Sequence, residues 1–229
     1  MRRIEPEASR WQLPDPLLAP QGADLIAAGS AIEPALMLAG YRQGLFAMPL
    51  ADTLVGWFSP DPRGVLPLER LHVSRSLRRA LRRYRVSIDR AFEDVVEGCA
   101  DPQREGHWIA PDFVDCYREL HRMGWAHSIE VWDTNDELAG GLFGVEVAGF
   151  FSGESMFHRE RDASKVAVVA LVERLVKAGG NRLLDVQWLT PHLQSLGVTA
   201  IKRREYVARL RRVADLSPAF EPATDGLED

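Results

Sequence analysis

The chain has 229 residues, of which 46% are hydrophobic and 27% charged, and its formal net charge is −5. This composition is typical of a globular protein large enough for one domain or slightly more, and it excludes a disordered chain. The negative net charge argues against a protein that coats nucleic acid without selectivity, because such binding depends on an excess of Lys and Arg.

No apolar run approaches the roughly 20 residues that a membrane span requires, and the first residues lack the apolar segment of a signal peptide. We therefore expect a cytosolic protein without a membrane partner. Cys99 and Cys116 are the two cysteines. They form no C-x-x-C pair and cannot build a disulfide framework, so we expect both to be reduced thiols.

Residues 1–33 are rich in Pro, Ala and Gly, and we expect an irregular arm there. The first helix is predicted from Pro34 to Gln43, because proline is typical of an opening turn and Gly44 is a suitable stop. The prolines of residues 57–63 disfavour regular structure. We place a domain boundary near residue 63, which predicts a small N-terminal domain over 1–63, a second domain over 64–214 and a loose acidic tail over 215–229.

Beyond residue 63, segments with helical spacing alternate with segments typical of strands. Predicted strands occupy residues 65–66, 86–88, 127–132, 137–146, 149–157 and 182–188. Predicted helices occupy a basic segment after Ser74, residues 91–99, 111–123 and 163–178, a short segment from Thr190, and residues 203–213. Helices around three or four central strands predict an α/β domain with a mixed sheet.

The strand predicted at 182–188 carries a polar pair. Because side chains alternate along a strand, Asp185 and Gln187 are expected on one face of a segment that is otherwise apolar. A carboxylate there can accept a proton or a hydrogen bond from an amine, and the carboxamide can orient a carbonyl or an ammonium group. The alternative is a structural ion pair between Asp185 and a nearby arginine.

Residues 153–157 read Gly-Glu-Ser-Met-Phe. They do not complete the G-x-S-x-G motif of serine hydrolases, because Phe157 stands where that turn needs a small residue. Glu154 lies on a Phe-rich strand, and a buried carboxylate needs a partner. That partner is either a cationic ligand or an internal arginine such as Arg159 or Arg161.

The histidines show no metal-binding spacing, and neither of the common glycine-rich phosphate-binding motifs occurs. We therefore expect no metal and no cofactor. Arg75, Arg78, Arg79 and Arg82 follow the spacing of one helical face with no acid among them. We interpret this face as a contact for a nucleic-acid backbone; the alternative is a plain solvated helix.

Several segments together resemble the leucyl/phenylalanyl-tRNA–protein transferase family, over about residues 33–206. These segments are Ala39–Phe46 (AGYRQGLF), Trp57–Arg63 (WFSPDPR), His127–Trp132 (HSIEVW), Gly140–Val145 (GGLFGV), Gly153–Phe157 (GESMF), Asp162–Lys165 (DASK) and Leu184–Gln187 (LDVQ).

This resemblance implies a catalytic domain with the N-acetyltransferase-like fold behind a small N-terminal domain. It also implies transfer of Leu or Phe from an aminoacyl-tRNA to the α-amino group of a protein that begins with Arg or Lys, which marks that protein for degradation. Exchange of an ester for a peptide bond needs neither ATP nor a metal. The implied partners are aminoacyl-tRNA and acceptor proteins, and we expect a monomer.

By the same resemblance, Asp185 and Gln187 hold the attacking amine, and Asp185 acts either as a general base or only by orienting that amine. Glu154 suits the cationic terminus of the acceptor, and Trp108 resembles an aromatic shelf for the 3′-terminal adenosine. The other substrate-binding candidates are Tyr41, Ser155, Met156 and Phe157, of which Met156 and Phe157 are expected to line the pocket for the Leu or Phe side chain.

Two other functions stay open. An acyl-CoA-dependent N-acyltransferase would share the implied fold, although no glycine-rich turn that opens a helix is present to hold a pyrophosphate. A non-catalytic tRNA- or RNA-binding protein would account for the arginines but not for Asp185, Gln187 and Glu154.

Overall fold

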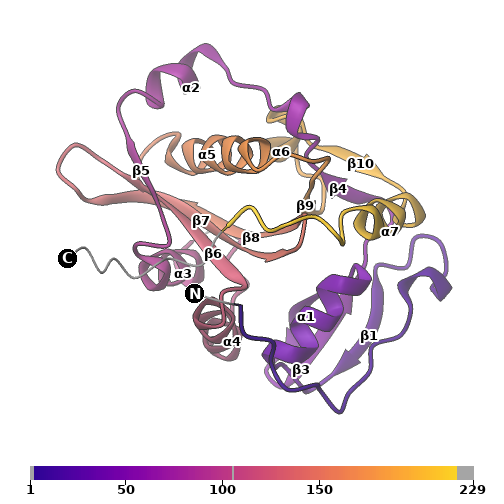
Figure 1. The fold of residues 1–229 in the computed structure, drawn as a ribbon. Helices are drawn as coiled ribbons and strands as arrows, with labels where there is room; N and C mark the ends of the chain where they lie inside the picture. Colours follow the sequence, from indigo (N-terminus) through magenta and orange to yellow (C-terminus); the bar gives the residue numbers. More distant parts are fainter. Residues whose placement is uncertain (1–2, 105, 221–229) are drawn as a thin grey trace.

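The computed structural model describes residues 3–104 and 106–220. It contains a three-stranded sheet near the N-terminus and a seven-stranded sheet that forms the centre of the molecule (Figure 1). The chain passes from the small sheet to the large one between Phe58 and Arg63. The predicted division into domains at residue 63 stays a prediction, because one hydrophobic cluster runs from the small sheet to the helices of the large one.

The small sheet has the strand order β1-β3-β2, and its neighbours are antiparallel. Its elements are the 3-10 helix η1 (Pro16–Leu18), β1 (Leu25–Gly29), α1 (Pro34–Gln43), β2 (Phe46–Ala51) and β3 (Leu54–Phe58). Helix α1 has the predicted bounds, and Gly44 ends it with φ 88°, a left-handed conformation that suits glycine. The expectation of an irregular arm over residues 1–33 was wrong for η1 and β1, because β1 finds its hydrogen-bond partners on β3, far along the chain.

The large sheet has the order β10-β4-β9-β8-β7-β6-β5. Its strands are β4 (Arg63–Val65), β5 (Arg85–Ile88), β6 (Ala126–Trp132), β7 (Leu138–Val147), β8 (Phe150–His158), β9 (Leu183–Gln187) and β10 (Thr199–Ile201). Its neighbours are antiparallel except β8 and β9, which are parallel. The mixed α/β class is therefore confirmed, with a sheet wider than the three or four strands expected.

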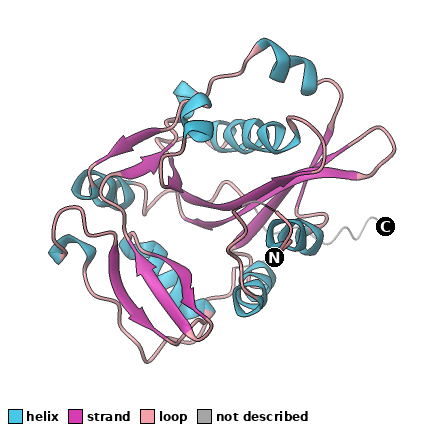
Figure 2. Cartoon of the chain, turned by 180° about the vertical axis from the view of Figure 1, so that it is seen from behind, coloured by secondary structure: helices cyan, strands magenta, loops and turns pink. Residues whose placement is uncertain are grey.

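Helices cover both faces of this sheet (Figures 1 and 2). They are the 3-10 helix η2 (Leu68–Arg70), α2 (Arg75–Ala80), α3 (Phe92–Ala100), α4 (Pro111–Arg122), α5 (Ala163–Lys177), α6 (Pro191–Ser195) and α7 (Arg203–Arg212). Helix α5 connects the parallel strands β8 and β9 and packs on one face, whereas α3 and α4 pack on the other. Helix α5 is rich in Val and Ala and is buried along most of its length. This suits a helix that packs on a sheet on one side and on other elements on the other.

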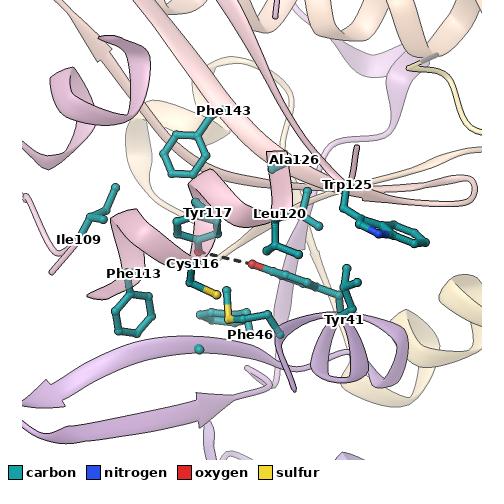
Figure 3. Packing of buried hydrophobic residues seen from close by; sticks show 14 of the residues in the cluster. Tyr41, Phe46, Ile109, Phe113, Cys116, Tyr117, Leu120, Trp125, Ala126 and Phe143 are labelled. Carbon is teal, nitrogen blue, oxygen red and sulfur yellow. Dashed lines mark hydrogen bonds between the residues drawn. The ribbon is translucent and has the colours of Figure 1, made fainter. Parts of the chain in front are cut away.

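The contact between α1 and α4 joins the small sheet to the large one. Tyr41 of α1 and Tyr117 of α4 meet through their hydroxyl groups, 3.4 Å apart, within a layer of aromatic and aliphatic side chains (Figure 3). Both rings are at most 1% exposed. The small sheet is therefore held close to α4, on the face of the large sheet opposite α5.

The prediction of a loose tail from residue 215 was wrong for residues up to 220. The backbone amides of Ala219 and Phe220 donate to the buried carboxylate of Glu146, at 2.6 and 3.1 Å, and the Phe220 ring stacks on His127. These contacts are invisible in the local composition, which is rich in proline and acid. Residues 221–229 lie outside the described residues. Among the described residues, no helix is long and apolar enough to cross a membrane.

Candidate active site

Strand β9 carries Asp185 into the interior between β4 and β8. The side chain is completely buried, and both of its oxygens are occupied. Arg63 of β4 donates Nε–H to Oδ1 at 2.8 Å and Nη2–H to Oδ2 at 2.6 Å. The hydroxyl of Tyr206 donates to Oδ2 at 2.9 Å, and the backbone amide of Gln187 donates to Oδ1 at 3.0 Å. Of the two interpretations of Asp185, the structure shows the ion pair with an arginine.

The guanidinium of Arg63 has further contacts besides Asp185. It lies 4.6 Å from the ring centroid of Phe46 and 4.5 Å from that of Tyr206, and Nη1 donates to the Gly44 carbonyl at 3.2 Å. Burial alone would lower the pKa of Arg63, but the charge of Asp185 outweighs that cost and the pKa is raised. Arg63 therefore stays charged, and its contacts tie β4, β9, α7 and the end of α1 together.

Gln187 ends β9 in a left-handed conformation with φ 59°. Its carboxamide nitrogen donates to the Gly153 carbonyl at 2.8 Å and to the hydroxyl of Ser152 at 3.0 Å, both on β8. The side chains of Asp185 and Gln187, which were expected on one face of the strand, have different partners, and Gln187 lines the cavity described below whereas Asp185 does not. The carboxylate fixes β9 to β4, and the carboxamide fixes β9 to β8.

Glu154 is the extra residue of a β-bulge. Pairing with β7 places Phe143 opposite Ser155 and Gly144 opposite Gly153, so that Glu154 has no partner on β7. Gly144 permits this bulge, because a Cβ there would lie 2.2 Å from the Ser152 carbonyl oxygen.

The side chain of Glu154 is buried. Oε2 accepts a hydrogen bond of 2.7 Å from the hydroxyl of Tyr117, whereas Oε1 is buried without a hydrogen-bond partner among the described residues. Burial raises the pKa of Glu154 to about 6, and hydrogen bonds from Tyr117, Ser152 and Tyr41 oppose that rise. Neither Arg159 nor Arg161 pairs with it. Glu154 therefore has one oxygen available for a cationic or proton-donating ligand.

A cavity of about 140 Å³ lies on the α5 side of the sheet. Its apolar lining includes Leu142 of β7, Met156 of β8, Val168 and Leu171 of α5, Val186 of β9 and Leu193 of α6. Gly153, Glu154, Ser155 and Gln187 also belong to the lining. The arrangement suits an apolar side chain whose polar end meets the bulge of β8 and the end of β9.

Met156 lines this cavity as predicted, but Phe157 does not. Neighbouring residues of a strand point to opposite faces, so the two side chains cannot share one pocket. Phe157 turns instead to α3, where its ring occupies the space that a Cβ at Gly98 would need. Ser155 accepts a hydrogen bond from Arg104 at 3.1 Å.

Trp108 lines a second, more open hollow of about 690 Å³ with His107, Ile109, Pro111 and Val114. The indole is half-buried and contacts Phe113 edge-on, with 5.7 Å between ring centroids. Tyr41 is buried behind Tyr117, so it supports Glu154 from the interior rather than facing a substrate.

The four predicted tRNA-binding arginines are exposed, and none forms an ion pair with a described acid. Helix α2 ends at Ala80, and Arg82 lies in the turn that follows, so the predicted continuous helical face was wrong at its last member. The neighbours Arg83 and Arg85 do pair, with Glu160 and Asp136. Where the chain is described, no three His, Cys, Asp or Glu side chains gather closely enough to hold a metal ion.

Three residues of this site were not given a role in the sequence analysis. Arg63 stood at the end of a conspicuous segment, but nothing local indicated a partner 122 residues away. Tyr117 and Tyr206 occupied helical positions typical of core aromatic residues. The signal that could have found Arg63 is the cost of burying Asp185 without a cation.

Comparisons with known proteins show the family of this chain. A model of the family described as leucyl/phenylalanyl-tRNA protein transferase matches residues 65–211. The leucyl/phenylalanyl-tRNA–protein transferase of Anaeromyxobacter sp. (strain Fw109-5) is 50% identical over 208 residues, which cover 88% of this chain and 87% of that protein. The protein of the same name from Herpetosiphon aurantiacus is 46% identical over 82% of this chain and 98% of its own.

Among solved structures, a GCN5-related N-acetyltransferase from Sphaerobacter thermophilus aligns with a TM-score of 0.34 and 15% identity, over 62% of this chain and 50% of that chain. So low a likeness assigns no fold, and the N-acetyltransferase-like class stays a prediction. The family model covers more than half of the chain, and the relatives exceed 45% identity over most of it. The chain therefore belongs to the leucyl/phenylalanyl-tRNA–protein transferase family.

Proposed function

We propose that this chain transfers Leu or Phe from an aminoacyl-tRNA to the α-amino group of a protein that begins with Arg or Lys. The observation that carries the proposal is the apolar cavity whose lining includes Glu154 and Gln187. The cavity takes the side chain of the transferred amino acid, and the polar residues at its border meet the ester and the attacking amine. Family membership supports this assignment of substrates.

The reaction exchanges an ester for an amide. The lone pair of the acceptor nitrogen attacks the ester carbonyl carbon, the new C–N bond forms, and the C–O bond to the terminal ribose breaks. The nitrogen loses a proton, and the ribose oxygen takes one. The ester supplies the free energy, so the chain has to bind, orient and manage the proton.

Glu154 is the group that we assign to the acceptor amine. An α-amino group is largely protonated at neutral pH because its pKa is about 7.7–8.0. With a pKa of about 6, Glu154 is ionised at the same pH and has Oε1 available. It can bind the ammonium form and accept one proton before the attack, because only the neutral amine has a lone pair; the second proton leaves the nitrogen as the amide forms, and the ribose oxygen takes one. Its partners Tyr117 and Tyr41 hold the carboxylate in place.

Asp185 acts as a positioning residue in this account. Its oxygens are saturated by Arg63, Tyr206 and the Gln187 amide, and it does not belong to the lining of the cavity. Its contribution is to fix β9, and with it the left-handed conformation of Gln187 at the cavity.

The tRNA is bound in two places. Its terminal adenosine stacks on Trp108 in the open hollow, and its backbone approaches the exposed arginines 75, 78, 79 and 82. Their charges have no acidic partner among the described residues, which leaves them available to phosphates. We further propose that the chain works as a monomer in the cytosol, and that the added residue marks the acceptor for degradation.

Two donors distinguish this function from its alternatives. The enzyme is incubated with an Arg-initiated peptide and either labelled leucyl-tRNA or labelled acetyl-CoA, and the peptide is analysed by mass. Leucine addition from leucyl-tRNA alone supports the proposal. Acetylation without leucine addition would support an acyl-CoA-dependent N-acyltransferase, and binding of tRNA without any transfer would support a non-catalytic RNA-binding protein.

A further inference from the structure

Arg104 connects the two hollows of the site. Its Nη2 donates to the hydroxyl of Ser155 at 3.1 Å, and its Nη1 donates to the Met156 carbonyl at 3.1 Å. Its Nε donates to the carbonyl of Cys99, at the end of α3, also at 3.1 Å. The guanidinium therefore grips the bulged strand that lines the apolar cavity.

The backbone of the same residue supports the segment that carries Trp108. The Arg104 carbonyl oxygen accepts from the His107 amide at 3.2 Å and lies 3.2 Å from Nδ1 of that imidazole. The Arg104 amide donates to the Asp101 carbonyl at 3.0 Å. Arg104 thus connects the segment that carries Trp108, at the open hollow, to the strand that lines the apolar cavity.

The partners of this side chain are three neutral oxygens on two elements, and no described carboxylate forms an ion pair with it. Only a planar, forked donor can reach three such acceptors at fixed angles; a lysine ammonium on the same stem cannot. The arrangement therefore fixes geometry rather than neutralising a charge.

We propose that Arg104 is a positioning residue that sets the separation between the adenosine hollow at Trp108 and the aminoacyl cavity at Met156. This inference rests on the proposed function, in which one substrate occupies both places. A ligand that spans two sites gains affinity only when their separation matches its own length, and a displacement of about 1 Å at a reacting centre can cost about 100-fold in rate.

The first test uses a ligand of fixed length. The probe is 3′-deoxy-3′-(leucylamino)adenosine, whose amide link resists transfer, and adenosine alone is the comparison. In Arg104→Lys and Arg104→Gln, we expect probe affinity to fall about 10-fold or more, and adenosine affinity to fall less than about 3-fold. Arg122→Ala, which removes an exposed arginine paired with Glu119, should change neither. Thermal unfolding of each variant shows whether the fold is kept.

A pair of double-mutant cycles locates the effect. Arg104→Lys is combined with Trp108→Ala and, separately, with Leu142→Ala, and probe affinity is measured for each. Non-additive effects in both cycles are expected, because the spacing acts only when both ends of the ligand are bound.

Four results would overturn the proposal. Coupling in one cycle alone would reduce Arg104 to a support of that one hollow. If Arg104→Lys kept wild-type probe affinity and Arg104→Gln lost it, the positive charge of residue 104 would be what matters, and not the forked geometry of the guanidinium. If the wild-type chain neither binds the probe nor transfers leucine, the proposed function fails and this inference fails with it; if it does both while Arg104→Lys equals wild type, the inference alone fails.

Discussion

Arg63 and Asp185 form a two-pronged ion pair between residues that lie 122 positions apart in the chain, and neither side chain reaches solvent. A buried pair of this kind holds two strands in one register but adds little net stability compared with apolar residues of similar size. Its value here lies in what it fixes, because β9 carries Gln187 to the border of the cavity.

Asp185→Asn should therefore lose stability as well as activity. The change leaves the Arg63 charge buried without its partner, which costs about 3–5 kcal/mol, measured by urea-induced unfolding. The double variant Arg63→Met with Asp185→Leu should recover most of that stability and part of kcat/KM. If stability returned while activity stayed absent, Asp185 would be acting on the proton, and the positioning role would be wrong.

Glu154→Gln should stabilise the folded chain at neutral pH. The pKa of Glu154 is raised from 4.5 to about 6 in the folded state, so the protonated form is favoured there. That stabilisation is complete below pH 4.5 and is lost as the pH rises through about 6. Glutamine mimics the neutral form at every pH. The variant should exceed wild type by up to about 2 kcal/mol at pH 7.5 and match it near pH 4.

Thermal unfolding at those two pH values checks this directly, and the same variant should transfer leucine poorly. Equal stability of the two proteins at pH 7.5 would contradict a raised pKa. Greater stability with undiminished transfer would remove Glu154 from the reaction while leaving its environment as described.

Val168→Phe should reduce the size of amino acid that the cavity accepts. Val168 lines the cavity from α5, and the larger side chain of phenylalanine at this position would fill space that the substrate side chain needs. Phe transfer should fall more than Leu transfer, with a change in the kcat/KM ratio of about 10-fold or more. Val176→Phe is the matched control, because Val176 lies on the same helix but is 58% exposed. Equal losses for the two amino acids would place the aminoacyl side chain elsewhere.

Alanine at Arg75, Arg78, Arg79 and Arg82 should weaken tRNA binding and flatten its salt dependence. Each lost phosphate contact should reduce the slope of log K against log salt by about 0.7–0.9. The measurement is tRNA affinity at several salt concentrations, with Arg122→Ala as the control. If the slope of log K against log salt were unchanged in the fourfold variant, these arginines would not contact the tRNA backbone and would only form a solvated surface.

Local signals in the sequence were reliable where local physics decides the structure. Pro34 and Gly44 marked the bounds of α1, and Ser74 marked the start of α2, where its hydroxyl accepts from the Leu77 amide at 3.2 Å. Each of these depends on neighbouring residues alone. The α/β class followed from the same alternation of patterns.

Features that depend on distant partners were not predictable in this way. The hairpin of β2 and β3 was not predicted, and the expectation that residues 57–63 lack regular structure was wrong at both ends, where β3 ends and β4 begins. Strand β10 forms because β4 lies beside it. Met156 and Phe157 are neighbours on β8 and point to opposite faces, so the expectation that both line one pocket was wrong for Phe157. The sequence indicated that an arginine could pair with Asp185, but it did not indicate that this arginine is Arg63.

The most direct test of the account is leucine transfer to two peptides that differ in one group. Labelled leucyl-tRNA or labelled phenylalanyl-tRNA is supplied with an Arg-initiated peptide whose α-amine is free or acetylated, without ATP or added metal, using wild type and Val168→Phe. The account predicts transfer to the free amine alone, by wild type, and a loss in the variant that is larger for phenylalanine. Transfer to the acetylated peptide, or no transfer from either charged tRNA by a folded wild-type chain, would contradict it.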